Sequence, residues 1–225
     1  MPLALRHRDD PAPAWAPLPA LAVRRETRAA VMAALQGKSE DEMRRRFSAG
    51  HRAYVATWGG EPAAWGWVAT RSAEIGELGS AFAIPPGERY LWNFVTLAAH
   101  RGLGIYPRLL DAIVRAESGE AERFWIAYAP ENHASGAGIR KAGFATVAEL
   151  SFTAAGRPAV SERMEGGGPS AARVLGLPVA REPLAPCWRC VRAGRTPLMW
   201  CPPGSCACDY QVAESGCASA AAVTP

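Results

Sequence analysis

Apolar residues recur at helical spacing in the middle of the chain, between residues 105 and 117. The apolar face of this helix comprises Leu109, Leu110, Ile113 and Val114. Pro107 suits the first helical turn, where its missing N–H is not needed, and Gly119 is placed to end the helix. A strand-like run over residues 89–96 precedes it. We therefore predict a strand, a short glycine loop and an amphipathic helix across residues 96–117.

Two helices and a hairpin are predicted ahead of that strand. The pattern over residues 21–35 is helical, and Gly37 follows it as a stop. Ser39 opens a second helix, with Glu42 three residues later as the partner in a capping box. Residues 51–71 hold two runs rich in aromatic and β-branched residues, joined by glycines, which indicates a β-hairpin.

The segments after the central helix continue the sheet. Residues 124–129 are apolar on both faces, as in a strand buried inside a sheet, and a glycine-interrupted helix runs from Asn132 to Lys141. Further strands are predicted over residues 3–6, 144–152 and 158–161, with irregular or strand structure over 74–84. This order predicts a mixed α/β sheet with a right-handed crossover through the central helix.

Composition divides the chain into four parts. Residues 1–20 are proline-rich and are predicted to be an extended lead-in, and residues 21–164 hold the main domain. The glycine-rich stretch 165–186 is predicted to be a linker. Residues 187–225 carry all 6 cysteines of the chain, so a cysteine-free body is followed by a cysteine-rich tail.

Charge and hydropathy exclude several classes of protein. The net charge of +4 over 225 residues suits an anionic small ligand, but it is too small and dispersed to indicate nucleic-acid binding. The chain contains no run of about 18 apolar residues, so no membrane span is predicted. Residues 1–6 lack the apolar core of a signal peptide, which predicts a cytoplasmic protein.

The glycine loop is the first candidate for chemistry. Gly102 and Gly104 let the backbone turn sharply and let a ligand approach the amides of residues 103–106. With the positive end of the helix dipole, these amides suit a phosphate or pyrophosphate, and Arg101 adds a fixed positive charge. A plain turn that binds nothing is the alternative. Pro107 stands where a dinucleotide fingerprint needs its third glycine, so the anion site is of another kind.

Two motifs in this order resemble the GNAT superfamily of acyl-CoA-dependent N-acetyltransferases. The first is Arg101-Gly-Leu-Gly-Ile-Tyr106, which is similar to the family's pyrophosphate loop. The second runs from Asn132 to Gly143-Phe144 and is similar to the family's asparagine, helix and closing Gly-Phe. The resemblance covers roughly residues 21–152.

The resemblance implies a mixed, mostly antiparallel sheet flanked by helices, with acetyl-CoA as the co-substrate. The backbone of Phe94, Val95 and Thr96 would pair with the pantetheine arm as an added strand. The loop that would hold the pyrophosphate comprises Arg101, Gly102, Leu103, Gly104, Ile105, Tyr106 and Pro107. Asn132 corresponds to a position that contacts the cofactor near its reacting end.

The implied reaction transfers an acetyl or other acyl group from acetyl-CoA to a primary amine of an unidentified small molecule or peptide. A backbone N–H on the central strand would polarise the thioester carbonyl. Ile139 stands where the family often has an acid tyrosine, and Ala127 stands at one of its glutamate positions. Tyr90 and Glu88 are the remaining catalytic candidates; for Tyr90, a packing role in the sheet is the alternative.

The cysteine tail has its own interpretation. Its spacing resembles that of tetrathiolate zinc sites, with Cys187, Cys190, Cys201 and either Cys206 or Cys208 as ligands. A redox-active Cys-x-x-Cys and a flexible extension with incidental cysteines are the alternatives.

Three functional hypotheses follow. The chain is an N-acetyltransferase, a catalytically weak acyl-CoA-binding regulatory module, or an interaction protein that uses a metal-bound tail. The expected partners are acetyl-CoA and an amine acceptor, with no membrane and no nucleic acid. A monomer and a homodimer both fit the sequence.

Overall fold

The computed structural model describes residues 1–185, which build one eight-stranded sheet and a small two-stranded one. The large sheet has the strand order β10-β9-β1-β8-β7-β4-β3-β2. Its strands are β1 (Pro2–His7), β2 (Leu21–Glu26), β3 (His51–Trp58), β4 (Glu61–Ala69), β7 (Glu88–Thr96), β8 (Arg123–Ala127), β9 (Ala145–Phe152) and β10 (Pro158–Glu162). Only β7 and β8 pair in parallel; all the other neighbours are antiparallel. The mixed, mostly antiparallel sheet is therefore confirmed.

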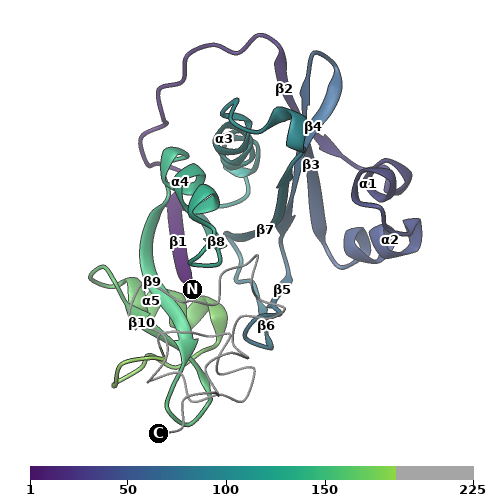
Figure 1. The fold of residues 1–225 in the computed structure, drawn as a ribbon. Helices are drawn as coiled ribbons and strands as arrows, with labels where there is room; N and C mark the ends of the chain where they lie inside the picture. Colours follow the sequence, from purple (N-terminus) through teal and green to yellow (C-terminus); the bar gives the residue numbers. More distant parts are fainter. Residues whose placement is uncertain (186–225) are drawn as a thin grey trace, which may run out of the picture.

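Helices cover both faces of the sheet (Figure 1). They are α1 (Ala29–Gln36), α2 (Glu40–Ser48), the short η1 (Ala98–His100), α3 (Ile105–Glu117), α4 (His133–Lys141) and α5 (Gly167–Leu175). On one face α3 and α4 bury the apolar residues of the central strands. On the other face α1 and α2 cover one half of the sheet, and α5 with the hairpin β5 (Ser72–Ile75) and β6 (Ser80–Ala83) covers the other half.

The predicted core elements are confirmed in type and place. The hairpin is β3–β4, the central helix is α3, and the buried strand is β8. Ser39 caps α2, because its hydroxyl accepts a hydrogen bond from the Glu42 amide. No helix in residues 1–185 is long and apolar enough to cross a membrane.

The helix predicted over residues 21–35 was wrong in its first half. Leu21–Glu26 forms the edge strand β2, which pairs with β3, and the helix begins only at Ala29. The buried carboxylate of Glu26 accepts hydrogen bonds from the backbone amides of Thr27 and Arg28, so it serves the turn between strand and helix. The pairing with β3 overrides the helical pattern.

Two segments expected to lie outside the main domain are part of it: one is a strand of its sheet, and the other is a helix packed against that sheet. Residues 2–7 form β1 between β8 and β9, so the strand predicted over residues 3–6 is present, but it belongs to the main sheet and not to a lead-in. The predicted linker contains α5, whose glycines serve close packing. A Cβ on Gly167 would lie 2.4 Å from the Val147 carbonyl oxygen, and Ala171 is fully buried. Glycine here marks close approach to the sheet, not flexibility.

Candidate active site at the split between two parallel strands

The central parallel strands β7 and β8 pair over only half of the length of β7. Backbone pairing runs from Glu88 opposite Arg123 to Leu91 opposite Ile126, and there it stops. β7 continues to Thr96 along β4 on its other side. Among the described residues, no strand pairs with the opposite edge of residues 92–96. This edge offers free backbone groups in the middle of the sheet.

A β-bulge lies where the two strands part. Trp67 of β4 pairs with Trp92, but Trp65 pairs with Val95, so β7 has one extra residue at this point. Asn93 within the bulge has a φ of 52°, and it is the only non-glycine with a positive φ in the described chain. Such a bulge bends the strand and strengthens its twist, which turns residues 92–96 away from β8.

The glycine loop lies at the end of the splayed half of β7. Gly102 and Gly104 have φ angles of 80° and 71°, so both use the left-handed conformation that glycine adopts without strain. Gly104 is the N-cap of α3. Because glycine has no side chain that could cap the helix, the first backbone amides of α3 stay free. Arg101 lies beside the strand end, where its Nε donates to the Thr96 carbonyl oxygen at 3.2 Å.

The start of α4 faces this loop. Asn132 caps α4 by accepting a hydrogen bond from the Ser135 amide at 3.0 Å. The Tyr106 hydroxyl lies 3.3 Å from the Ser135 hydroxyl, and the Tyr106 ring packs 5.6 Å from the Phe94 ring. A Cβ on Gly138 would lie 2.4 Å from that tyrosine ring, so glycine makes room for it. The structure thus brings three predicted cofactor contacts, Phe94, Tyr106 and Asn132, to one place.

Tyr106 keeps its proton at neutral pH. Burial raises its pKa to about 12, while the hydrogen bond with Ser135 opposes the shift. In the sequence this side chain is only a bulky residue within the glycine loop. In the fold the Tyr106 ring packs beside Phe94 and Gly138, and its neutral phenol lies beside the splayed half of β7.

Glu88 and Tyr90 lie at the other, paired end of β7. The Glu88 carboxylate accepts a hydrogen bond from the Trp125 indole N–H at 2.6 Å and pairs with Arg123 and Arg173. Tyr90 is buried edge-on against Phe82, and burial raises its pKa. The structure does not bring these two residues together with the glycine loop. Their catalytic role stays a prediction, and their contacts favour a structural role.

An aromatic wall on the α1–α2 face was not predicted from the sequence. The Arg46 guanidinium lies 4.9 Å from the Trp92 ring and 5.2 Å from the Trp67 ring. The His51 ring lies edge-on to Trp92 at 5.1 Å. Gln36 joins the wall to the bulge, because its Oε1 accepts from Arg46, Trp67 and Asn93. The only sequence feature that indicates this wall is the presence of tryptophans in the predicted strands.

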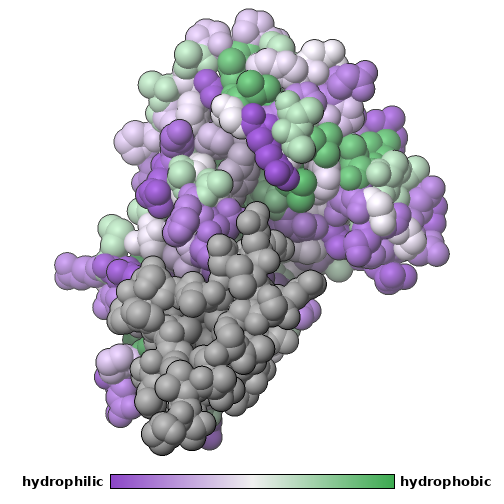
Figure 2. Space-filling model, in the orientation of Figure 1, coloured by the Kyte–Doolittle hydropathy of each residue, from purple (hydrophilic) through white to green (hydrophobic). Residues whose placement is uncertain are grey.

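Two polar atoms of the wall are buried without a partner in the described chain. Within residues 1–185, the buried Trp92 Nε1 and His51 Nδ1 have no hydrogen-bond partner. Burial, together with the positive charge of Arg46, lowers the pKa of His51, so its imidazole is neutral at pH 7. Figure 2 shows hydrophobic side chains gathered toward α1 on one face of the molecule, among hydrophilic ones.

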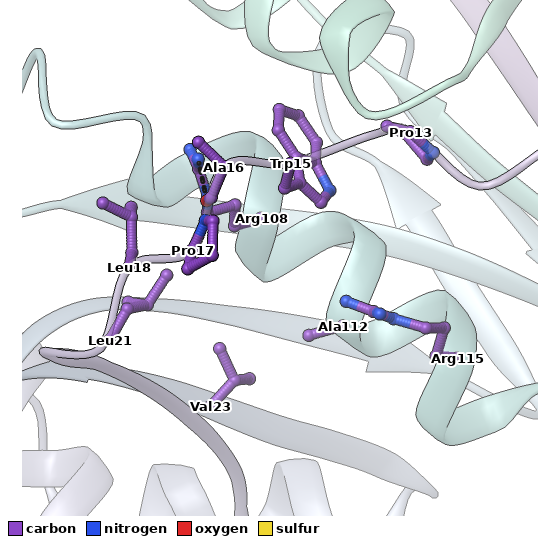
Figure 3. Close-up of a pocket in the computed structure, with 10 residues that line it drawn as sticks. All are labelled: Pro13, Trp15, Ala16, Pro17, Leu18, Leu21, Val23, Arg108, Ala112 and Arg115. Carbon is purple, nitrogen blue, oxygen red and sulfur yellow. Dashed lines mark hydrogen bonds between the residues drawn. The ribbon is translucent and has the colours of Figure 1, made fainter.

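A separate pocket of about 460 Å³ lies between α3, the edge strand β2 and residues 13–18 (Figure 3). Trp15 and Arg108 form part of its wall. It lies beside the edge strand, whereas the split lies between strands in the middle of the sheet.

The predicted metal ligands Cys187, Cys190, Cys201 and Cys206 lie outside the described residues. Within residues 1–185, no group of three or more His, Cys, Asp or Glu side chains is placed to hold a metal ion. The zinc site therefore stays a prediction.

A mixed sheet flanked by helices, with a split parallel pair that leads into a glycine loop at a helix start, is the fold that the GNAT resemblance implies. Residues 21–144 match the profile of the Acetyltransferase (GNAT) family, which is more than half of the chain. The chain therefore belongs to the GNAT acetyltransferase family. A comparison with curated proteins finds no match.

Several solved structures are similar to this chain. A GCN5-related N-acetyltransferase from Kribbella flavida is 19% identical, with a TM-score of 0.45 over 64% of this chain; the match spans 53% of that protein, about half of its length. An aminoglycoside antibiotic 6'-N-acetyltransferase from Acinetobacter haemolyticus is 19% identical, with a TM-score of 0.43 over 59% of this chain and 96% of that one. An acetyl transferase from Salmonella typhimurium, which modifies the N-terminal serine of ribosomal protein L7/L12, is 20% identical, with a TM-score of 0.43 over 61% of this chain and 87% of that one.

Proposed function

We propose that this protein is an N-acetyltransferase that transfers the acetyl group of acetyl-CoA to a primary amine. The observation that carries the proposal is the unpaired edge of residues 92–96, which leads directly into the glycine loop at the start of α3. Family membership supports the same conclusion.

The described residues suit each part of the thioester carrier. The free edge of Phe94–Thr96 would pair with the amides of the pantetheine arm, as an added strand does. The amides of residues 103–106 and the positive end of α3 would bind the diphosphate, with the exposed Arg101 beside them. Asn132, at the N-terminus of α4, would lie close to the reacting end.

The chemistry is attack of a neutral amine nitrogen on the thioester carbonyl carbon. The new C–N bond forms, the C–S bond breaks, the amine loses a proton and the leaving thiolate gains one. A backbone N–H in the splayed half of β7 would bind the developing oxyanion. Holding donor and acceptor together in the split supplies a further large part of the rate.

Tyr106 is the best-placed proton donor for the thiolate. It is protonated at neutral pH and packs against Phe94 in the splayed half. Tyr90 and Glu88 remain candidates from the sequence, but they lie at the paired end, before the strands separate.

The acceptor amine would enter along the aromatic wall. The arginines within residues 21–48 would favour an acidic or polar acceptor. Arg46, however, pairs with Glu42 at 2.6 Å and stacks on two tryptophans, so the wall offers flat aromatic surface more than unpaired charge.

Calorimetric titration of the full chain with acetyl-CoA tests the proposal, followed by thiol-release assays against a panel of amines. We expect saturable binding and acceptor-dependent release of CoA. Absence of both binding and thermal stabilisation would overturn the assignment. The alternative, a catalytically weak acyl-CoA-binding module, is favoured by Ile139 and Ala127; it predicts binding without release for every amine.

The third hypothesis, an interaction protein with a metal-bound tail, depends on residues outside those described. Metal analysis of the purified chain, beside a Cys187→Ser/Cys190→Ser variant, tests it. Stoichiometric zinc in the wild type alone would support the site, and metal-free wild type would exclude it.

A further inference from the structure

The proline-rich segment between β1 and β2 crosses over α3 (Figure 1). The sequence predicts only an extended lead-in here. In the structure, the Trp15 indole N–H donates to the Asp111 carboxylate on α3 at 3.0 Å. Proline limits the conformations of the segment, so little entropy is lost when it is held across the helix. The segment is therefore a fixed strap over the helix that follows the glycine loop.

Arg108 contacts this strap, as Figure 3 shows at Ala16, and it also reaches the glycine loop at Gly104. One guanidinium nitrogen donates to the Ala16 carbonyl oxygen at 3.0 Å, and another donates to the Gly104 carbonyl oxygen at 3.2 Å. The guanidinium also stacks on the Trp15 ring, 4.7 Å from its centroid. A single side chain thus contacts the strap twice and the N-cap of α3 once.

The strap is anchored in the core. The fully buried Asp111 that receives Trp15 also pairs with Arg6 of β1 at 2.9 Å. Arg6 donates in turn to the Ala142 carbonyl oxygen at the end of α4, at 2.8 Å. A contiguous set of polar contacts therefore runs from the loop through Arg108, Trp15 and Asp111 to the central sheet. Movement of the loop would have to break contacts within it.

The contact with Gly104 affects the groups proposed to bind the diphosphate. The peptide between Gly104 and Ile105 is planar and trans, so a carbonyl held toward Arg108 turns the Ile105 N–H the opposite way, out of the helix start. Among residues 1–185 no carboxylate forms a salt bridge with Arg108, so its charge adds to the positive end of the helix. Both effects favour an anion at the loop.

We infer that Trp15 and Arg108 form a clamp that holds the glycine loop ready for the diphosphate of acetyl-CoA. The inference rests on the proposed function and assigns two positioning residues that lie outside the loop motif. The clamp acts on binding of the carrier and not on the bond-breaking step, so its loss raises KM for acetyl-CoA and leaves kcat nearly unchanged.

The test compares Arg108→Ala, Arg108→Lys and Trp15→Ala with the full wild-type chain. We expect Arg108→Ala to weaken acetyl-CoA binding roughly tenfold, the size expected for one lost charge-assisted hydrogen bond. Arg108→Lys should restore part of the affinity, because it keeps the charge but cannot contact two carbonyls as a fork. Arg115→Ala is the matched control, since Arg115 lies on the same helix and pairs with Asp111 but does not contact the loop.

Hydrogen exchange separates failure of the clamp from failure of the proposed function. We expect faster amide exchange at residues 102–106 in Arg108→Ala and Trp15→Ala than in Arg115→Ala. If the wild type binds acetyl-CoA and Arg108→Ala binds it equally well, the clamp is overturned while the function stands. If the wild type does not bind, the function fails; equal exchange in the three variants would then also reject the clamp.

Discussion

The two ends of strand β7 differ in backbone pairing and in burial. At the paired end, residues 88–91 are buried, hydrogen-bonded to β4 and β8, and tied by Glu88 to Trp125 and α5. At the splayed end, residues 92–96 are partly exposed and keep one backbone edge unpaired among the described residues. The bulge at Asn93 separates these halves. A strand can thus be rigid at one end and offer a ligand edge at the other.

The largest expected effect is on stability, at the paired end. Glu88→Ala would leave Arg173 and the Trp125 N–H without their buried acceptor, and should lower the free energy of unfolding by about 3 kcal/mol. Urea denaturation measures this. Glu120→Ala is the control, because Glu120 also accepts from two arginines but is 59% exposed. Its loss should cost under about 1 kcal/mol. A stable Glu88→Ala protein without activity would instead support a catalytic Glu88.

The next effect is on turnover and compares the partly buried Tyr106 with the buried Tyr90. Tyr106→Phe should lower kcat roughly a hundredfold, the lower range for loss of a general acid. Tyr90→Phe should leave kcat close to wild type, because Tyr90 lies on the paired half of β7 and packs against Phe82. Thiol-release kinetics at saturating acetyl-CoA measure both. The reverse order would return the catalytic role to Tyr90 and remove the functional contrast between the two ends.

A smaller effect is expected on acetyl-CoA affinity, from a substitution in the glycine loop. Gly104→Ala requires a left-handed alanine, which costs roughly 1–2 kcal/mol. Its Cβ would also lie 2.7 Å from a guanidinium nitrogen of Arg108. We expect acetyl-CoA affinity to fall several-fold, as measured by titration. Gly119→Ala is the control, since its Cβ would meet nothing within 4 Å. Unchanged binding in Gly104→Ala would place the diphosphate elsewhere.

The smallest effect concerns pH and the wall beside the bulge. The pKa of His51 is lowered in the folded protein, so folding disfavours its protonated form. The contribution of neutral His51 to the free energy of unfolding is fully present above the pKa of about 6.5 that histidine has in the unfolded chain. This contribution is lost as pH falls from there toward the lowered pKa of the folded state. The wild type should therefore lose slightly more Tm between pH 7.5 and 5.5 than His51→Gln does. Tryptophan fluorescence follows this unfolding. Equal losses would show that His51 titrates normally.

Much of this organisation could be predicted from the sequence, because it rests on local chemistry. Periodicity placed α3, β8 and the hairpin, and glycine chemistry placed the loop. Asn132 was placed at the right helix start, where its side chain now caps α4. Prediction from the sequence failed where contacts with neighbouring strands determine the secondary structure. Residues 21–26 became a strand through β3, and residues 167–175 became a helix through contact with β9 and β10.

The sequence by itself determined the short-range features of this protein: where helices begin, where the backbone must turn, and which loop can present free amides to an anion. Those properties depend on residues within a few positions of one another. Only the tertiary structure decided which half of β7 stays unpaired, that Tyr106 reaches Ser135, and that Trp15 holds Arg108 against the loop. These contacts join residues 29 to 93 positions apart, and no local pattern records such pairings.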